Sequence, residues 1–316
     1  MMSVPAASDS DRAVAVQSVH KTFRAGGKSV AALKSVSFDV QRRELFGIIG
    51  PDGAGKTTLF RILTTLLVAD KGQASVDGLD VVSAYKSLRR RIGYMPGKFS
   101  LYQDLTVEEN LAFFATLFNT SVGENYDLIR DIYGQIEKFK TRKAGALSGG
   151  MKQKLALSCA LIHRPSVLFL DEPTTGVDAV SRKEFWELLH QLQEQGITIV
   201  VSTPYMDEAG QCDRVALIQE GSILDVDTPQ GIISSFTEPL WSLRSSNMYR
   251  LMKDVRDQGL ARSCYPFGQV HHVVWQPGID PQRSLEALKG NHPEIRMERI
   301  APTIEDCFMA KMHRPG

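Results

Sequence analysis

The chain has 316 residues, which suggests about two domains, and 43% of them are hydrophobic and 23% charged. This composition excludes collagen, a mucin-like stalk and a fully disordered chain. The formal net charge of +1 gives no sign of a nucleic-acid partner.

Short apolar runs alternate with helical patterns through the first part of the chain. Leu45–Ile49 is predicted to be a strand, and Thr57–Leu67 is predicted to be the helix after it. Thr106 and Glu109 have the spacing of a capping box, which predicts the start of another helix. Residues 1–12, before these elements, show no signal-peptide pattern and are expected to form a disordered lead-in.

The middle of the chain continues this alternation. Ser148 is predicted to cap a helix that ends before Pro165, and Val167–Leu170 is predicted to be a buried strand. Ser181 and Glu184 have the spacing of a second capping box.

The next part of the chain is predicted to contain mainly strands. Ile197–Val201 is predicted to be buried, and Val215–Gln219 with Ser222–Asp225 predicts a hairpin. Strands that alternate with helices predict an α/β fold with a mainly parallel sheet. Residues 233–316 change in character, with short strands separated by proline-containing polar stretches, and predict a small α+β domain.

The first candidate site is a loop formed by Gly50, Pro51, Asp52, Gly53, Ala54, Gly55, Lys56 and Thr57, followed by Thr58. It matches GxxxxGK[ST] between a predicted strand and a predicted helix, which is the context that this motif requires. Glycines let backbone N–H groups approach phosphate oxygens, and the helix N-terminus adds its positive dipole end. Lys56 can reach the β- and γ-phosphates of a nucleotide, and Thr57 can ligate Mg²⁺.

An acid pair, Asp171 and Glu172, follows the buried run at residues 167–170. The carboxyl ends of strands are where open α/β sheets bind ligands. Asp171 can hold Mg²⁺, and Glu172 can polarise the attacking water as a general base. The loop and the acid pair together predict a nucleoside triphosphatase with Lys56 and Glu172 as its catalytic residues.

A second anion site is predicted at Ser148, Gly149 and Gly150, where a helix begins. Because the chain already has a phosphate loop, this site is expected to close on the nucleotide of a second chain in a head-to-tail dimer. With the preceding leucine the motif reads Leu-Ser-Gly-Gly. Over residues 13–230 the chain resembles the ATP-binding cassette (ABC) ATPases, for which this motif is the signature.

The resemblance implies ATP and Mg²⁺ as ligands. It also implies a P-loop NTPase domain over residues 13–232, with a helical subdomain inserted at about residues 98–160, and a C-terminal accessory domain beyond it. Asp178 corresponds to the aspartate of the family's D-loop, and Phe23 to the aromatic residue that stacks on adenine. The alternative for Phe23 is an ordinary core position.

Three further segments, Ser100–Asn110, Tyr205–Ala209 and Pro302–Phe308, resemble ATPases of type-2 ABC exporters, the drug-resistance and lipid-exporting sort. The resemblance implies a homodimer or heterodimer that closes on ATP, reopens on hydrolysis and drives a separately encoded membrane permease. No apolar run reaches about 18 residues, so the chain is not expected to span a membrane itself. We therefore expect a peripheral protein on the cytoplasmic face of the inner or plasma membrane.

Two positions depart from the family pattern. Gly97 stands where the family has a glutamine, Pro204 stands where it has a histidine, and neither Gln103 nor His163 replaces them by register. Losing one donor to the γ-phosphate is worth about 1.5–3 kcal/mol, or roughly tenfold to 150-fold in rate. Two interpretations stay open: neutral variation, or a slow site whose rate Pro204→His, and to a smaller extent Gly97→Gln, would raise.

Two other functions stay open beside the exporter motor. One is a soluble ABC ATPase that acts on ribosomes or DNA, against which the single cassette and the near-neutral charge argue. The other is a binding-only cassette that pairs with an active homologue.

Weaker signals have structural explanations. His271 and His272 are neighbours on a predicted strand and point to opposite faces, so they are not expected to bind one metal ion. Tyr94, Phe99 and Tyr102 are expected either to line a groove for a permease helix or to pack the hinge between subdomains.

Overall fold

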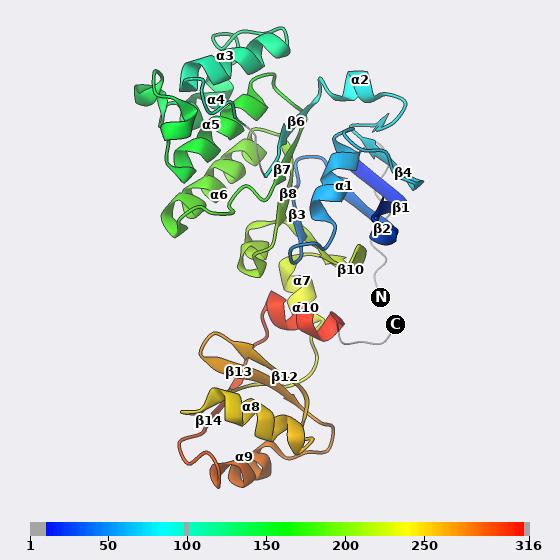
Figure 1. Ribbon diagram of the computed structural model, residues 1–316, viewed down its shortest axis with the longest axis vertical. Coiled ribbons are helices and arrows are strands. Elements are labelled where there is room, and N and C mark those ends of the chain that lie inside the picture. The colour runs from blue at the N-terminus through cyan, green and yellow to red at the C-terminus, as the bar shows by residue number, and fades with distance from the viewer. Residues whose placement is uncertain (1–10, 98–100, 313–316) are drawn as a thin grey trace. The chain divides into compact units, whose positions relative to one another are not determined.

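The computed structural model describes residues 11–97 and 101–312. It divides into two compact units, Met1–Pro229 and Gln230–Gly316. Most of the expected lead-in lies outside the described residues, but the first strand already begins at Arg12, the last residue assigned to that lead-in. Figure 1 shows the elements of both units.

The first unit contains β1 (Arg12–Ala25), β2 (Lys28–Gln41), β3 (Leu45–Ile49), α1 (Lys56–Leu63), β4 (Lys71–Val76), β5 (Leu79–Asp80), α2 (Tyr85–Leu88), β6 (Ile92–Met95), α3 (Val107–Leu117), α4 (Tyr126–Tyr133), α5 (Gly149–Leu161), β7 (Val167–Asp171), α6 (Ala179–Glu194), β8 (Thr198–Thr203), β9 (Arg214–Gln219) and β10 (Ser222–Asp227). The short helix α7 (Pro229–Ser234) contains the boundary between the units, so the expected boundary at residues 232–233 lies inside a helix.

The main sheet of the first unit has the strand order β10-β9-β3-β8-β7-β6. Strands β9, β3, β8, β7 and β6 are parallel, and β10 pairs antiparallel with β9 as the predicted hairpin. Every residue of β3, β7 and β8 is buried. Both faces of such strands are covered, which is why they appear in the sequence as continuous apolar runs.

A second sheet, with the order β2-β1-β4-β5, is antiparallel and was not predicted. Strands β1 and β2 are each 14 residues long, and their pairing shifts register after Arg12, Val16, Val19 and Lys21. Each shift interrupts the two-residue alternation by which a half-buried strand is recognised.

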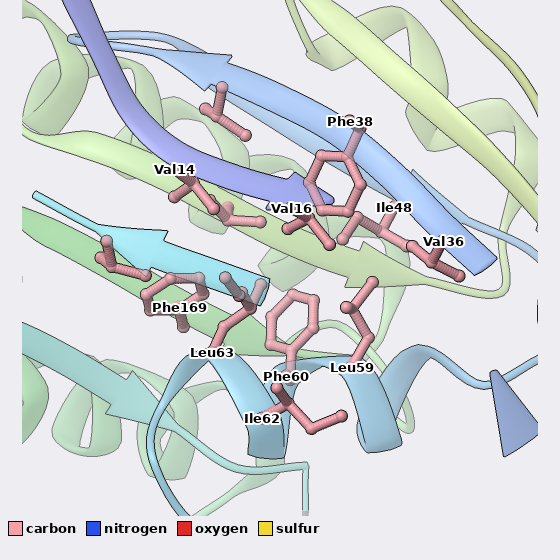
Figure 2. Close-up of a cluster of buried hydrophobic side chains, with 14 of the residues drawn as sticks. Val14, Val16, Val36, Phe38, Ile48, Leu59, Phe60, Ile62, Leu63 and Phe169 are labelled. Carbon is pink, nitrogen blue, oxygen red and sulfur yellow. The ribbon is translucent and has the colours of Figure 1, made fainter. Parts of the chain in front are cut away.

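The core of the first unit fills the space between these sheets around α1. Figure 2 shows Leu59 and Phe60 of α1 pointing toward side chains of both sheets. The rings of Phe60 and Phe169 meet edge to face, with centroids 5.8 Å apart. The helix ends at Leu63 rather than at the predicted Leu67 because Thr65 has φ +65°. This packing fixes the position of α1 and therefore of the loop that directly precedes it.

Helices α3, α4 and α5 form the insertion between β6 and β7 (Figure 1). The predicted capping box of α3 and the predicted Ser148 cap of α5 are both confirmed. The predicted cap of α6 is wrong. The carboxylate of Asp178 accepts from the N–H groups of Val180 and Ser181, so Ser181 lies inside the helix, while Glu184 pairs with Lys154 at 2.7 Å.

The second unit contains β11 (Leu240–Arg244), α8 (Met248–Asp257), β12 (Ala261–Phe267), β13 (Val270–Trp275), α9 (Pro281–Lys289), β14 (Arg296–Ile300) and α10 (Ile304–Met312). Its strands pair antiparallel in the order β12-β13-β11-β14, which is the split βαβ arrangement. A core that includes Leu243, Leu251, Val273 and Leu288 joins the sheet to α8 and α9. The unit is therefore an α+β domain.

Candidate active site

The glycine loop joins β3 to α1, and its glycines are required by its geometry. Gly53 and Gly55 have φ angles of 79° and 109°, which residues with a side chain rarely adopt. A Cβ at Gly50 would lie 2.1 Å from the carbonyl oxygen of Ile218, and one at Gly55 would lie 2.5 Å from that of Ala32. The backbone therefore packs tightly on one side and can present N–H groups to an anion on the other.

Lys56 is the first residue of α1, and its side chain is only 3% exposed. Its ammonium donates to the carbonyl oxygens of Gly50 at 2.8 Å and Pro51 at 3.1 Å, and it lies 3.1 Å from Oε1 of Glu172. The two predicted catalytic side chains are therefore in contact.

An open groove of about 490 Å³ borders this pair. It is lined by Ser29, Val30, Ala31, Ala32, Lys34, Gly53, Gly55, Lys56, Thr57, Thr58, Glu172 and Glu220. Of these, the β2 residues and Glu220 were not predicted from the sequence. No local motif marks them, although Glu220 precedes the glycine of the predicted hairpin. The glycine turn, the buried cation and the groove together fit a nucleoside triphosphate.

The acid pair lies at the end of β7. Asp171 is buried, and its Oδ1 accepts from the Ser202 hydroxyl at 2.7 Å. The N–H of Glu172 donates to both the carbonyl oxygen and the hydroxyl of Ser202, each at 3.0 Å. Hydroxyl and carboxylate oxygens, as in Thr57 and Asp171, are ligands that Mg²⁺ prefers.

Gly97 follows β6 and lies beside the acid pair. A Cβ at Gly97 would be 2.8 Å from the carbonyl oxygen of Asp171 and 3.9 Å from Cβ of Glu172. Position 97 therefore lies next to the acids, as the family resemblance implies. However, the backbone approaches too closely for a side chain, which argues against the expected gain from Gly97→Gln.

Pro204 follows β8, the strand that neighbours β7. Its ring provides neither an N–H nor a side-chain donor. The adjacent Thr203 hydroxyl accepts from the N–H of Tyr205 at 3.0 Å.

The signature residues lie at the start of α5. Ser148 and Gly149 are exposed, and the Ser148 hydroxyl accepts from the Met151 N–H at 3.4 Å. A Cβ at Gly150 would be 2.6 Å from the Ser181 hydroxyl, so α5 rests directly on α6 there. Within the described residues, Ser148, Gly149, Gly150 and Asp178 do not line the groove around Lys56.

Phe23 lies on β1 and is 42% exposed, which argues against the core alternative. It is paired in register with Val30, a residue of the groove. Residues directly opposite each other on neighbouring strands share a face, so Phe23 lies on the face toward which Val30 points. Asp70 supports this part of β1 by accepting from Lys21 at 2.8 Å and from the Thr22 N–H at 2.7 Å.

The paired histidines of the second unit are structural. His271 contacts the carbonyl oxygen of Met248 at 2.7 Å, and His272 contacts Asp306 at 2.6 Å. Across residues 11–97 and 101–312, no cluster of three or more His, Cys, Asp or Glu side chains is arranged to hold a metal ion.

Two of the three predicted groove aromatics are described, and Phe99 lies outside the described residues. Tyr94 lines an open groove of about 730 Å³ between the β6 edge and the helical insertion, together with Tyr85, Phe114 and Arg89. Tyr102 is half exposed instead and packs edge-on against the ring of Phe113, with centroids 4.8 Å apart.

Residues 33–175 match the family model described as ABC transporter. The chain is 40% identical over 297 residues to Nod factor export ATP-binding protein I of Burkholderia orbicola (strain AU 1054), which covers 90% of this chain and 93% of that protein.

Two further similarities cover less of this chain. It is 42% identical over 205 residues to the probable multidrug ABC transporter ATP-binding protein YbhF of Escherichia coli (strain K12), which is 64% of this chain but only 35% of that protein. Among solved structures, it resembles the ATP-binding cassette MJ0796, a dimer in a post-hydrolysis state bound to ADP and Pi. That match has a TM-score of 0.62 and 27% identity, and covers 68% of this chain and 98% of the other.

Proposed function

Because this chain belongs to the ATP-binding proteins of ABC transporters, we propose that it is the ATP-hydrolysing motor subunit of an exporter. The observation that carries the proposal is the buried Lys56 ammonium, 3.1 Å from Glu172 at the head of the glycine loop. The names of two relatives, one for Nod factor export and one for a probable multidrug transporter, favour export as the direction.

The chemistry follows from the residues of the groove. Lys56 and the N–H groups at the start of α1 bind the β- and γ-phosphates. A phosphate oxygen then takes the place of Glu172 beside the ammonium, and the freed carboxylate accepts a proton from the attacking water. Thr57 and Asp171 would hold Mg²⁺, which when bound neutralises phosphate charge.

Assembly follows from where the signature residues lie. Ser148 and Gly149 are exposed, and at the start of a helix they suit an anion supplied by another chain. We assign them, with Gly150 and Asp178, to the nucleotide of a partner ATPase subunit. The dimeric form of MJ0796 supports this arrangement.

The groove beside Tyr94 is proposed to receive a cytoplasmic segment of the membrane permease. It combines aromatic side chains with Lys86, Arg89 and Arg90 at its border. In the part of the chain that the structure describes, no helix has the length and apolar character needed to cross a membrane. We therefore propose peripheral attachment at the cytoplasmic face through the permease.

A second candidate, a slow or binding-only cassette paired with an active homologue, is favoured by one observation. Neither Gly97 nor Pro204 can supply a side-chain donor to the γ-phosphate or the water. Lys56, Asp171 and Glu172 are retained, which favours hydrolysis.

The test is nucleotide binding by Lys56→Ala. This change removes the motif's side-chain cation and its charge-assisted bonds, so we expect ATP binding at least about tenfold weaker. Calorimetric titration of the full chain measures it, with the exposed Lys71→Ala as the control. Equal ATP affinity in wild type and Lys56→Ala would contradict the proposal.

A further inference from the structure

Glu208 is a buried carboxylate that the mechanism above does not use. It lies in the 3₁₀ segment Met206–Gln211 after β8, and its side chain is 4% exposed. A carboxylate withdrawn from water in this way is costly unless it is paired and hydrogen-bonded. Its partners therefore show what the charge holds in place.

Those partners come from three different segments. Oε2 accepts from the hydroxyl of Thr174 at 3.1 Å and from that of Thr203 at 2.5 Å. Oε1 faces Nε of Arg182, on α6, at 3.6 Å. The Arg182 guanidinium in turn lies 4.3 Å from the ring centroid of Tyr205.

Two of these three segments border the reacting groups. Thr174 is two residues after Glu172, and the N–H of Thr175 donates back to the Glu172 carbonyl oxygen at 3.2 Å. Thr203 directly precedes Pro204. One buried carboxylate thus connects the loop behind the proposed general base to the segment where the family histidine is replaced.

The backbone conformations of Glu172 and Pro204 explain why such a connection is needed. Glu172 has φ +52°, a conformation that persists only where its surroundings hold it. Pro204 cannot anchor its own segment through a side-chain hydrogen bond. Catalytic side chains keep a reactive geometry only when neighbouring groups hold them in place.

We propose that Glu208 is a positioning residue for ATP hydrolysis, which through Thr174 and Thr203 fixes Glu172 and the Pro204 segment in their reactive arrangement. This inference rests on the proposed ATPase function. It concerns the hydrolysis step and not nucleotide affinity, because within the described residues Glu208 does not line the groove around Lys56.

The test compares turnover, ATP affinity and melting temperature in the full chain. Glu208→Ala removes both hydroxyl contacts, so we expect kcat to fall about tenfold while the Kd for ATP stays within about threefold. Glu208→Gln keeps an acceptor for both hydroxyls and should restore most of the rate. Thr174→Val removes one contact at nearly constant volume, and serves if Glu208→Ala does not fold.

The matched control is Glu44→Ala. Glu44 is also buried, accepts from the Gln41 N–H and lies 3.3 Å from Arg214, but it precedes β3 at the opposite end from the glycine loop. The Glu44→Ala substitution should lower the melting temperature and leave kcat near the wild-type value.

The outcomes separate the two proposals. ATP hydrolysis by the wild type that is much slower in Glu172→Gln supports the ATPase function. If the wild type does not hydrolyse ATP, both the ATPase function and the positioning role are overturned. If the wild type hydrolyses ATP but Glu208→Ala, or Thr174→Val in its place, lowers kcat no more than Glu44→Ala does, only the positioning role is overturned. A fall in ATP affinity as large as the fall in kcat overturns it as well.

Discussion

The backbone of Glu172 lies in the left-handed region, with φ +52°, which residues with a side chain rarely adopt. Such a conformation costs roughly 1–3 kcal/mol and tends to occur at functional sites. The N–H of Glu172 donates to the carbonyl oxygen and the hydroxyl of Ser202, and the Glu172 carboxylate contacts Lys56. The strain therefore lies at the residue that we assign as general base.

Pro204 leads to a prediction about rate. Pro204→His would introduce an imidazole donor near the γ-phosphate as its charge develops, and one such donor is worth roughly tenfold in rate. We expect turnover to rise by about that factor with ATP affinity nearly unchanged. Steady-state hydrolysis and calorimetric titration of the same preparations measure the two effects.

Pro204→Ala is the control, because it removes the ring without adding a donor. A histidine variant that binds ATP normally but turns over no faster than wild type would show that the proline is neutral variation. In that case the water is positioned by Glu172 and its neighbours without help from position 204.

Helix α10 shows how one buried group fixes an element. Asp306 is fully buried; its Oδ1 is bonded by His272 at 2.6 Å and by the Tyr265 hydroxyl, and its Oδ2 by the N–H and hydroxyl of Thr303, each at 2.7 Å. Burial alone would raise the pKa of this carboxyl, but the hydrogen bonds from Thr303, Tyr265 and His272 outweigh it and hold the pKa below its usual value.

This shift predicts acid sensitivity of the C-terminal unit. Because the folded-state pKa is the lower one, the stabilisation is present above the unfolded pKa of about 4 and is lost as pH falls through the folded value. Asp306→Asn should lower stability at pH 7 and flatten the loss below about pH 4.

Tryptophan fluorescence can follow this transition. In a Trp186→Phe background the signal comes from Trp241 and Trp275, which both lie in the C-terminal unit. Asp257→Asn, at an exposed position on α8, is the control. An acid transition unchanged by Asp306→Asn would show that other groups cause it.

The assembled molecule is expected to be a nucleotide-dependent dimer. Glu172→Gln should slow hydrolysis and leave the ATP contacts of the glycine loop unchanged. Two chains should then remain closed on ATP, each contacting the partner's nucleotide through Ser148 at the start of α5. Sedimentation with ATP and Mg²⁺ should then show a dimer that dissociates when ADP replaces ATP. A strict monomer at high concentration would argue against a homodimer and would favour pairing with a different ATPase subunit.

The features that could be predicted from sequence depend on residues close together in the chain. The glycine loop, the acid pair and the caps at Thr106 and Ser148 are each defined within a few positions, since a loop binds phosphate and a cap ends a helix through local geometry. The strands β3 and β7 could be predicted because burial of both faces leaves a continuous apolar run.

Other features depend on contacts between segments that are far apart in the sequence. Thr174 and Glu208 are 34 positions apart, as are His272 and Asp306, and no periodicity connects either pair. The close approach of Gly97 to the Asp171 carbonyl oxygen likewise arises where β6 lies beside β7. These contacts exist because the fold brings distant segments of the chain together, and a buried charge placed there must find its partners in three dimensions.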